Sequence, residues 1–296
     1  MRAVQPLSLC ALMAGLFFAV VPACAAPMLP VYGPATPADE LNSPSNDWAD
    51  SISFDGLKIV IHSARNGLGD RLFSATRASP ADPFSTPTDA EFVNINTTAF
   101  DIRMGVISPS GLELFYTAES VGPPATQIMR ATRASAAAPF GSPQALSGLQ
   151  IGSSLHFPNF ISADAKRLYY WNSSGQLFVT ARADVGSPFG APSAAPFVNM
   201  PYAENLYLTQ DELEMYFNSG DRIWWTWRPD LNTPFAAAQS VESINAGSSG
   251  AGPVLFGNSL HFTRGLDILR ATLIPEPGVL CPSVLAALAL RRRRWG

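Results

Sequence analysis

Few side chains of this sequence have the types and positions that acid–base chemistry requires. Asp47, Asp101, His156 and Glu204 each stand at or near the beginning of a segment that we expect to form a strand. Two carboxylates in one cleft can cleave a glycosidic bond when the pKa of one is raised, and a histidine can act as a general base. The spacing does not mark any two of these residues as a pair. The sequence therefore favours a non-enzymatic protein, with a glycosidase-like enzyme as the alternative.

Three other side chains could bind a ligand without catalysing a reaction. Trp225 and Trp227 stand where comparable segments carry small residues. They either fill a gap between packed segments or form an exposed platform for a sugar ring. Arg103 lies two residues after Asp101, at the beginning of the same segment, and is the third candidate.

The sequence contains no motif that is typical of a metal site or of a cofactor-binding site. All three cysteines, Cys10, Cys24 and Cys281, lie in the terminal segments, so a disulfide framework or a thiolate metal site in the middle is excluded. His62 and His261 fall within expected strands, where a partly buried imidazole is the usual case. P-loop, dinucleotide-binding and nucleophile-elbow motifs are absent from the sequence. We expect no metal and no cofactor.

The charge balance argues against a nucleic-acid partner. Of the 19 Lys and Arg residues, Arg2 and Arg291–Arg294 lie in the terminal segments, as does Glu276 among the 23 Asp and Glu, which leaves 14 against 22 in the middle. Nucleic acids are bound by basic surfaces. The apolar fraction of 47% is enough for a sizeable core.

A repeated motif indicates the strands that would position these residues. In this motif an arginine is followed, seven residues later, by the phenylalanine of a Pro-Phe pair. The pairs are Arg77 and Phe84, Arg133 and Phe140, Arg182 and Phe189, and Arg228 and Phe235. Ten residues after each phenylalanine an amide side chain follows, at Asn94, Gln150, Asn199 and Asn245. The recurrence of both spacings in four segments indicates an internal repeat.

The repeated arginines could form a ring of anion-binding groups, or they could stabilise the repeats themselves. In the second case each arginine pairs with a turn aspartate, at Asp55, Asp164 or Asp211, or stacks on a neighbouring aromatic ring. A position that recurs in every repeat but one is usually architectural, so we expect the structural role.

Each repeat contains enough turns and apolar segments for about four short strands. A turn rich in Ser, Asp and Gly comes first, as in Ser53–Gly56 and Ser108–Gly111, and an apolar strand, a second turn and a second strand follow. The repeats measure 46–56 residues from phenylalanine to phenylalanine. This period and this strand content are typical of β-propeller blades.

A fifth repeat is split between the two ends of the domain. Leu260–Phe262 and Asp267–Thr272 match its strands, with Leu273 in the place of the arginine, and the outer strand is missing there. Tyr32 is followed ten residues later by Asn42, which is the phenylalanine-to-amide spacing of the other repeats. We therefore predict an all-β propeller of five four-stranded blades over residues 26–274, closed by an N-terminal strand. Six blades are the alternative.

The repeat resembles that of WD-repeat-like, TolB-type propellers. The residues that carry the resemblance are Ser53–Leu57, Ala75–Arg77, Pro83–Pro87 and Leu41–Ser43. The resemblance implies a propeller and, commonly, a binding or scaffold role. The chain departs from true WD repeats because the Gly-His and Trp-Asp pairs are missing.

Residues 1–25 are typical of a signal peptide. Arg2 precedes an apolar run over Leu7–Val21, and Ala23-Cys24-Ala25 has the small-residue pattern of a cleavage site. A lipoprotein signal ending at Cys24 is the alternative.

Residues 275–296 join the motif Pro275-Glu276-Pro277 to an apolar stretch, Gly278–Leu290, and to a cluster of four arginines, Arg291, Arg292, Arg293 and Arg294. The stretch is shorter than the roughly 20 residues of an ordinary transmembrane helix, and the arginines would hold its end in the cytoplasm. This tail resembles the PEP-CTERM sorting tail of Gram-negative bacteria. The resemblance implies transient inner-membrane anchoring, cleavage by an exosortase-type enzyme and release to the surface.

Together these observations predict an exported, monomeric propeller at the cell surface, on the outer membrane or in the extracellular matrix. Its processing partners would be signal peptidase and an exosortase-type enzyme. We expect it to bind a protein or a glycan that the sequence does not identify. A glycan-active enzyme and a purely structural matrix component are the alternatives.

Overall fold

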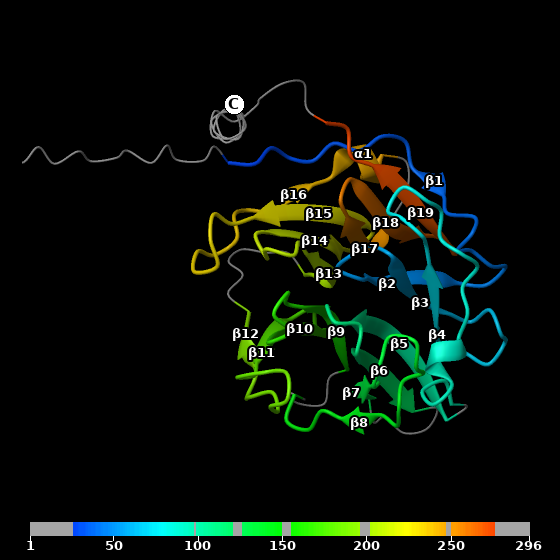
Figure 1. The fold of residues 1–296 in the computed structure, drawn as a ribbon. Coiled ribbons are helices and arrows are strands. Elements are labelled where there is room, and N and C mark those ends of the chain that lie inside the picture. Colours follow the sequence, from blue (N-terminus) through cyan, green and yellow to red (C-terminus); the bar gives the residue numbers. More distant parts are fainter. Residues whose placement is uncertain are drawn as a thin grey trace, which may run out of the picture.

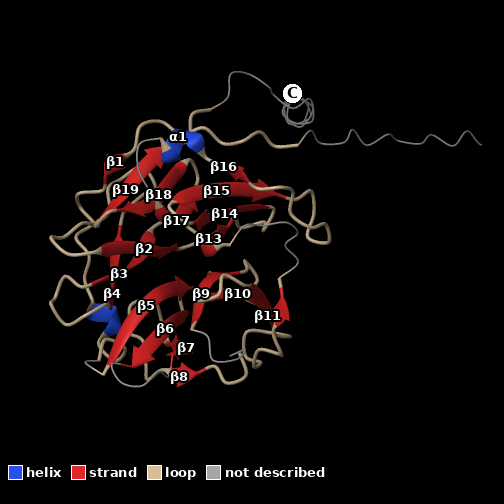
Figure 2. Ribbon diagram, turned by 180° about the vertical axis from the view of Figure 1, so that it is seen from behind, coloured by secondary structure: helices blue, strands red, loops and turns tan. Residues whose placement is uncertain are grey.

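The computed structural model describes residues 26–97, 99–120, 126–149, 155–195, 202–246 and 250–275. The predicted signal peptide lies outside the described residues, as does the predicted sorting tail except for Pro275. The described chain forms a five-bladed β-propeller whose sheets surround a central axis (Figure 1), and nearly all of its regular structure is strand (Figure 2). The predicted fold class and blade number are confirmed.

Each blade is an antiparallel sheet that corresponds to one predicted repeat. Blade 1 contains β2 (Asp47–Ile52), β3 (Lys58–Ser63) and β4 (Arg71–Thr76). Blade 2 contains β5 (Phe100–Ile107), β6 (Glu113–Ser120), β7 (Thr126–Thr132) and β8 (Gln144–Ala145). Blade 3 contains β9 (His156–Ile161), β10 (Arg167–Asn172), β11 (Leu177–Ala181) and β12 (Ser193–Ala194). Blade 4 contains β13 (Glu204–Leu208), β14 (Glu214–Ser219), β15 (Arg222–Trp227) and β16 (Gln239–Ser240).

Blade 5 unites the two ends of the domain. Its sheet order is β1, β19, β18, β17, from β1 (Thr36–Pro37) outside to β19 (Asp267–Thr272), β18 (Ser259–Arg264) and β17 (Ala251–Phe256) inside. Thr36 pairs with Arg270, and Tyr32 forms a further antiparallel bridge with Leu273. The predicted closure by an N-terminal strand is therefore confirmed. Closure covers the outer edge of β19, which would otherwise be a possible aggregation site.

The outer position of blade 1 is the least regular. Its sheet has three strands, and the outer position is held by an isolated bridge between Ser74 and Thr88. The chain then passes through a short 3₁₀ helix, η1 (Ala90–Phe92); a single helical turn, α1 (Glu242–Asn245), occupies the same place after blade 4.

The hydrophobic core consists of separate clusters between neighbouring blades. Val60 of blade 1 packs with Leu114 of blade 2, and Phe115 of blade 2 packs with Leu168 of blade 3. Similar clusters join blades 3 and 4, blades 4 and 5, and blades 5 and 1. Each blade therefore buries both of its faces, which explains why its strands are apolar on both sides.

The repeated amide fastens the end of a repeat to its third strand. The side chain of Asn245 accepts a hydrogen bond from Ile223 N and donates one to Ile223 O, at 2.9 and 2.8 Å. Asn42 does the same with Ile268 of β19, at 2.7 and 3.0 Å. Gln150 and Asn199 lie outside the described residues.

In blade 1 the predicted amide is off by two residues. Asn96, not Asn94, makes the paired hydrogen bonds, with Leu72 at 3.0 and 2.8 Å. Asn94 instead donates to the carbonyl oxygen of Phe140 in blade 2, at 2.7 Å.

We predict that Asn42→Ala destabilises the closure of the ring. The change removes the hydrogen-bond partner of Ile268 N–H and one of the two donors to Ile268 O. With about 1 kcal/mol for each net hydrogen bond, we expect the free energy of unfolding to fall by about 2 kcal/mol. Urea unfolding measures this, with Asn94→Ala, which removes one bond, as the control. A smaller effect for Asn42→Ala than for the control would contradict this role.

Candidate functional site

The first residues of the five inner strands surround one end of the central channel. β2, β5, β9, β13 and β17 are neighbours around the ring, and each begins at the same end. We call this end the channel mouth. At the other end the rings of Phe54, Phe160 and Tyr207 lie close together, with centroids 6.4 and 6.0 Å apart, beside a cavity of only about 20 Å³. A ligand would therefore reach the channel from the mouth.

Asp47 is the first residue of β2 and therefore belongs to the channel mouth, but its carboxylate is buried and both of its oxygens accept hydrogen bonds. The side chain is 0% exposed, and it accepts hydrogen bonds from Ser43 N and Ser43 Oγ, at 2.6 and 2.9 Å. Arg65 donates to its other oxygen at 2.6 Å. Asp47 therefore fixes the entry into blade 1 and, contrary to expectation, is not a free catalytic carboxylate.

His156 is also withdrawn from the mouth. The residue is 0% exposed, and its ring packs against Tyr170 and Phe178 with centroids 5.8 and 6.4 Å away. Its backbone carbonyl accepts a hydrogen bond from the Thr117 hydroxyl of blade 2, at 2.9 Å. It is a core residue between blades and is not placed to act as a base on a ligand.

Glu204 begins β13 and is partly exposed. Its carboxylate accepts a long hydrogen bond of 3.3 Å from Asn218, the residue opposite it on β14. The neighbouring Tyr202 ring lies over Gly175 of blade 3, where an added Cβ would be 2.0 Å from the ring. Glu204 is therefore an accessible carboxylate on the blade 4 side of the mouth.

Asp101 and Arg103 belong to a charged cluster on the blade 2 side of the mouth. Arg103 Nε donates to Asp70 at 2.6 Å, and its terminal nitrogens lie 3.3 Å from Glu119 and 3.9 Å from Asp101. We call these four residues the Arg103 cluster. Three carboxylates around one guanidinium leave the cluster negatively charged, and the buried Arg71, 3.7 Å from Asp101, partly offsets this charge.

The sequence analysis missed Asp70 and Glu119. Asp70 comes from the loop before β4, and Glu119 lies directly opposite Asp101 on β6. Counting back from the turn at Ser108–Gly111 would have placed position 120 across from Asp101, and the bulge between Arg103 and Val106 brings Glu119 there instead. Nothing in the sequence indicates the position of Asp70.

The inner strands all carry an irregularity just inside the mouth. The pairing register shifts in β2, β5, β9, β13 and β17, and the backbone has positive φ at Met104 (56°), Asn205 (45°) and Gly252 (59°). Such bulges bend a strand and redirect its side chains. This gives every blade the same bend at the channel.

In blade 1 the bulge places a buried acid–histidine pair below the mouth. Asp50 contacts His62 Nδ1 at 2.6 Å and accepts a hydrogen bond from Gly105 N of blade 2 at 2.8 Å. Burial raises the pKa of Asp50 against the opposing effects of these partners. The ring of Trp48 stacks on His62 at 5.8 Å, which puts an aromatic side chain next to the blade that carries the Arg103 cluster.

The hypothesis of a tryptophan platform in blade 4 is wrong for Trp225. Trp225 is 0% exposed, and its indole N–H donates to Glu214 at 2.9 Å. Trp227 is partly buried and packs against the same cluster between blades 4 and 5. The large rings therefore fill the interface to blade 5 and do not stand on the surface.

The repeated arginines stack on the phenylalanines of their own repeats. The distances from Cζ to the ring centroid are 4.3 Å for Arg77–Phe84, 4.3 Å for Arg133–Phe140, 4.6 Å for Arg182–Phe189 and 4.5 Å for Arg228–Phe235. Of the two structural contacts expected, stacking on an aromatic ring is the one present. The turn aspartates instead accept hydrogen bonds within their own turns, as Asp55 does from Ser53 and Leu57.

Each arginine also holds the turn that opens its repeat. Its Nε donates to the carbonyl oxygen of the last turn residue, Gly56, Gly111, Ala165 or Glu212, at 2.6, 2.7, 2.9 and 2.8 Å. All four of these residues have positive φ. Ala165 and Glu212 adopt it at an energetic cost that glycine avoids.

Carboxylates complete this arrangement at three blade interfaces. Glu91 accepts from Lys58 of blade 1 and Arg133 of blade 2, both at 2.6 Å. Glu113 of blade 2 pairs with Arg182 of blade 3 at 2.6 Å. Glu212 of blade 4 bonds to Arg167 and Tyr169 of blade 3. These ion pairs bridge neighbouring blades at the end opposite the channel mouth.

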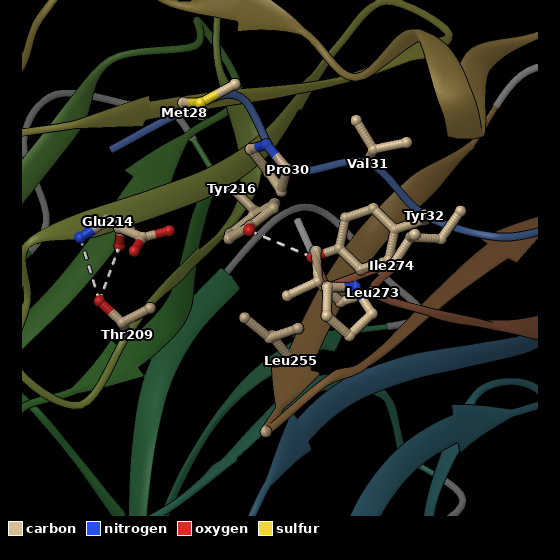
Figure 3. Close-up of a pocket in the computed structure, with 12 residues that line it drawn as sticks. Met28, Pro30, Val31, Tyr32, Thr209, Glu214, Tyr216, Leu255, Leu273 and Ile274 are labelled. Atoms are coloured by element: carbon tan, nitrogen blue, oxygen red, sulfur yellow. Dashed lines mark hydrogen bonds between the residues drawn. The ribbon is translucent and has the colours of Figure 1, made fainter. Parts of the chain in front are cut away.

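A cavity of about 330 Å³ lies where the N-terminal segment crosses blades 4 and 5 (Figure 3). The hydroxyl of Tyr32 donates to that of Tyr216 at 3.1 Å, and Glu214 is held by the indole of Trp225. Three residues singled out from the sequence line this cavity, Tyr32, Leu273 and Pro275. It is a largely apolar joint between the two ends of the domain.

Two further classes of site were sought in the described ranges. No group of three His, Cys, Asp or Glu side chains there is arranged to hold a metal ion. In the same ranges, no helix has the length and apolar character needed to cross a bilayer.

No family model matches the chain, and no curated protein matches its sequence. Among solved structures, a thermostable family-43 glycoside hydrolase is 12% identical with a TM-score of 0.54, over 82% of this chain and 99% of that one. The catalytic domain of a GH62 α-L-arabinofuranosidase from Coprinopsis cinerea is 12% identical with a TM-score of 0.51, over 82% and 95%.

TolB from Acinetobacter baumannii is 14% identical with a TM-score of 0.45, over 79% of this chain and 56% of that one. This chain thus spans little more than half of that TolB protein. The similar structures include a TolB protein, the type that the repeat resembles. At such identities these likenesses show the propeller fold alone.

We predict that Arg182→Ala strongly destabilises the protein. The guanidinium is 0% exposed, and its loss leaves Glu113 with Arg130, at 2.6 Å, as its remaining charged partner. Breaking a buried ion pair on one side costs about 3–5 kcal/mol, and because Arg130 stays we expect the lower end of this range, which denaturant unfolding would measure. Arg222→Ala, which breaks an exposed pair with Glu242, is the control and should lower the stability far less. Equal losses would show that Arg182 is not a structural residue.

Proposed function

We propose that this protein is an exported, non-enzymatic propeller that binds a glycan at the channel mouth, with the Arg103 cluster as the main contact. The observation that carries the proposal is the exposure of this cluster. The side chains of Arg103, Asp101 and Glu119 are 35%, 34% and 31% exposed, although they are held together by ion pairs. These side chains are therefore fixed in position and partly open to a ligand.

The composition of the mouth fits sugars better than other small ligands. Sugar hydroxyls both donate and accept hydrogen bonds, so they need carboxylate acceptors and guanidinium donors side by side. Trp48, partly exposed in the adjacent blade, offers an aromatic face for a sugar ring. Pre-positioned polar groups lose little conformational freedom when they bind.

One observation weighs against the glycosidase alternative. A hydrolase needs two carboxylates on either side of one glycosidic bond. Asp47 and His156, two of the four candidates, are buried, and Asp101 is in ion-pair contact with Arg103.

Export is supported by the arrangement of the two ends. Val31 O accepts a hydrogen bond from Ile274 N at 2.8 Å, and Thr272 O accepts one from Gly33 N at 2.9 Å. Figure 1 shows both ends of the described chain leaving on one side of the ring, at blade 5. A signal peptide and a sorting tail attached at this point would be removed without disturbing the blades.

We expect Arg103→Ala to abolish glycan binding. The change removes the donor at the centre of the cluster and releases three carboxylates that then repel one another. A glycan array with the purified protein identifies the ligand, and calorimetry should show affinity lower by at least about tenfold. Arg222→Ala, in an exposed ion pair of blade 4, is the matched control.

The proposal fails if the wild-type protein retains no glycan, or if Arg103→Ala and Trp48→Ala both bind as well as Arg222→Ala. Hydrolysis of the bound glycan that disappears in Glu204→Gln would favour the enzyme instead.

The sorting-tail hypothesis has a separate measurement. We expect protein isolated from the cell surface to begin near Ala26 and to end close to Pro277. Intact mass analysis reads both ends in one experiment. A surface protein that keeps the four arginines Arg291–Arg294 would exclude removal of the tail.

A further inference from the structure

The interface between blades 5 and 1 contains an open pocket where three of the other interfaces have an ion pair. The pocket has a volume of about 540 Å³ and lies at the end of the propeller opposite the channel mouth. Its lining includes Arg77, Phe84, Phe256, Ser259, His261 and Arg270. We call it the seam pocket.

One interface of the propeller shows how the position opposite a repeated arginine can be filled, although the equivalent residues of blades 1 and 3 are Lys58 and Arg167. Arg182 of blade 3 is met by Glu113, the first residue of the second strand of blade 2. For Arg77 of blade 1 the preceding blade is blade 5, and the first residue of its second strand is Ser259. Serine is too short to replace the glutamate, so the carboxylate position opposite Arg77 is not filled by the blade.

Arg77 therefore makes fewer hydrogen bonds than Arg182 does. Its guanidinium makes one hydrogen bond within the described residues, from Nε to Gly56 O at 2.6 Å, and its buried Nη2 has no partner there. By contrast, Arg182 uses Nη1 and Nη2 to bind both oxygens of Glu113, at 3.0 and 2.6 Å. The Arg77 side chain is only partly buried, but an enclosed nitrogen without a hydrogen-bond partner is costly, which makes this position favourable for an anion.

The cation is held rigidly between two rings. Phe84 lies 4.3 Å from Cζ of Arg77, and Phe256 of blade 5 lies 5.9 Å away. Phe256 itself packs on Gly56, where an added Cβ would be 2.3 Å from the ring. A carboxylate ligand would therefore meet a donor whose orientation is already fixed.

Two more groups favour a negatively charged ligand. Nδ1 of His261 is buried without a partner in the described chain, and burial, with Arg77 and Arg270, lowers the pKa of His261 to about 4. The imidazole is then neutral at pH 7 and still has a hydrogen bond to offer. Arg270 adds a second positive charge, which Glu40 partly balances at 2.9 Å, and Asp82 lies exposed at the rim.

We propose that the seam pocket binds a carboxylate ligand the size of a monosaccharide, such as a hexuronic acid, whose carboxylate takes the place opposite Arg77 that Glu113 takes opposite Arg182. The remaining space is large enough for a sugar ring, with Asn258 and Ser259 as polar contacts and two phenylalanine rings beside it. This site lies away from the channel mouth and does not depend on the proposed glycan binding there.

The first test introduces into blade 5, at position 259, a carboxylate equivalent to that of Glu113 in blade 2. Ser259→Glu places a glutamate opposite Arg77, so we expect a higher melting temperature and affinity for glucuronate weaker by at least about tenfold, since the charge-assisted pair is already made. Ser259→Gln has the same size without the charge and is the matched control. It should bind glucuronate far better than Ser259→Glu.

Calorimetry on the full protein compares glucuronate with glucose, which lacks the carboxylate. Binding of glucuronate but not glucose, lost in Ser259→Glu, is the expected result. The proposal is overturned if the wild-type protein binds no glucuronate, if glucose binds equally well, or if Ser259→Gln loses binding as completely as Ser259→Glu.

Two further variants distinguish a loss of glucuronate binding at the seam pocket from misfolding or from an effect elsewhere in the protein. Arg77→Gln should also lose glucuronate binding, and retained binding would overturn the proposal even if Ser259→Glu does not fold. Arg222→Ala should bind glucuronate like the wild type, because it changes only an exposed ion pair with Glu242 of blade 4.

Discussion

The whole propeller depends on one short pairing, that of the N-terminal segment with β19. Thr36 and Pro37 pair with Arg270 and Leu269, and Asn42 adds two hydrogen bonds to Ile268. This contact puts the first and last strands of the domain in one sheet. Since the core consists of clusters between adjacent blades, the cluster between blades 5 and 1 exists only while the ring is closed. Closure is thus what makes five separate interfaces into one cooperative structure.

A second interaction fixes the shape of each blade. The repeated arginine stacks on its phenylalanine and, through Nε, holds a turn residue with positive φ. Because this bond goes to a backbone carbonyl, it tolerates different side chains in the turn, and Ala165 and Glu212 occupy positions where blades 1 and 2 have glycine. The remaining nitrogens are free to meet a neighbouring blade. That division explains why the arginine recurs although its carboxylate partner changes from interface to interface.

Much of the fold could be predicted because repetition turns weak local signals into a strong one. The spacing from Tyr32 to Asn42 was enough to place the closing strand, and the turn sequences placed the strands of each blade. The shift from Asn94 to Asn96 could not be foreseen, since it depends on the 3₁₀ turn at Ala90–Phe92. The candidate site was harder for a physical reason. Burial decides whether a polar residue is available, and Asp47, His156 and Trp225 are buried by contacts with residues distant in sequence or by the adjoining blade. Asp70 and Glu119 were missed because they approach Arg103 from a loop and from the second strand.

The adjacency of the two ends has a mechanical consequence. A pull on the chain beyond Pro275 is transmitted first to the hydrogen bond between Ile274 and Val31 and then to the pairing of β19 with the N-terminal segment. These are the bonds that close the ring. A tether at this end would therefore load the closing strand before any complete blade, and blades 1 to 4 would bear tension only after the ring had opened. The strength of a protein tethered in this way would be set by a few backbone hydrogen bonds near the surface of blade 5, and not by its buried core.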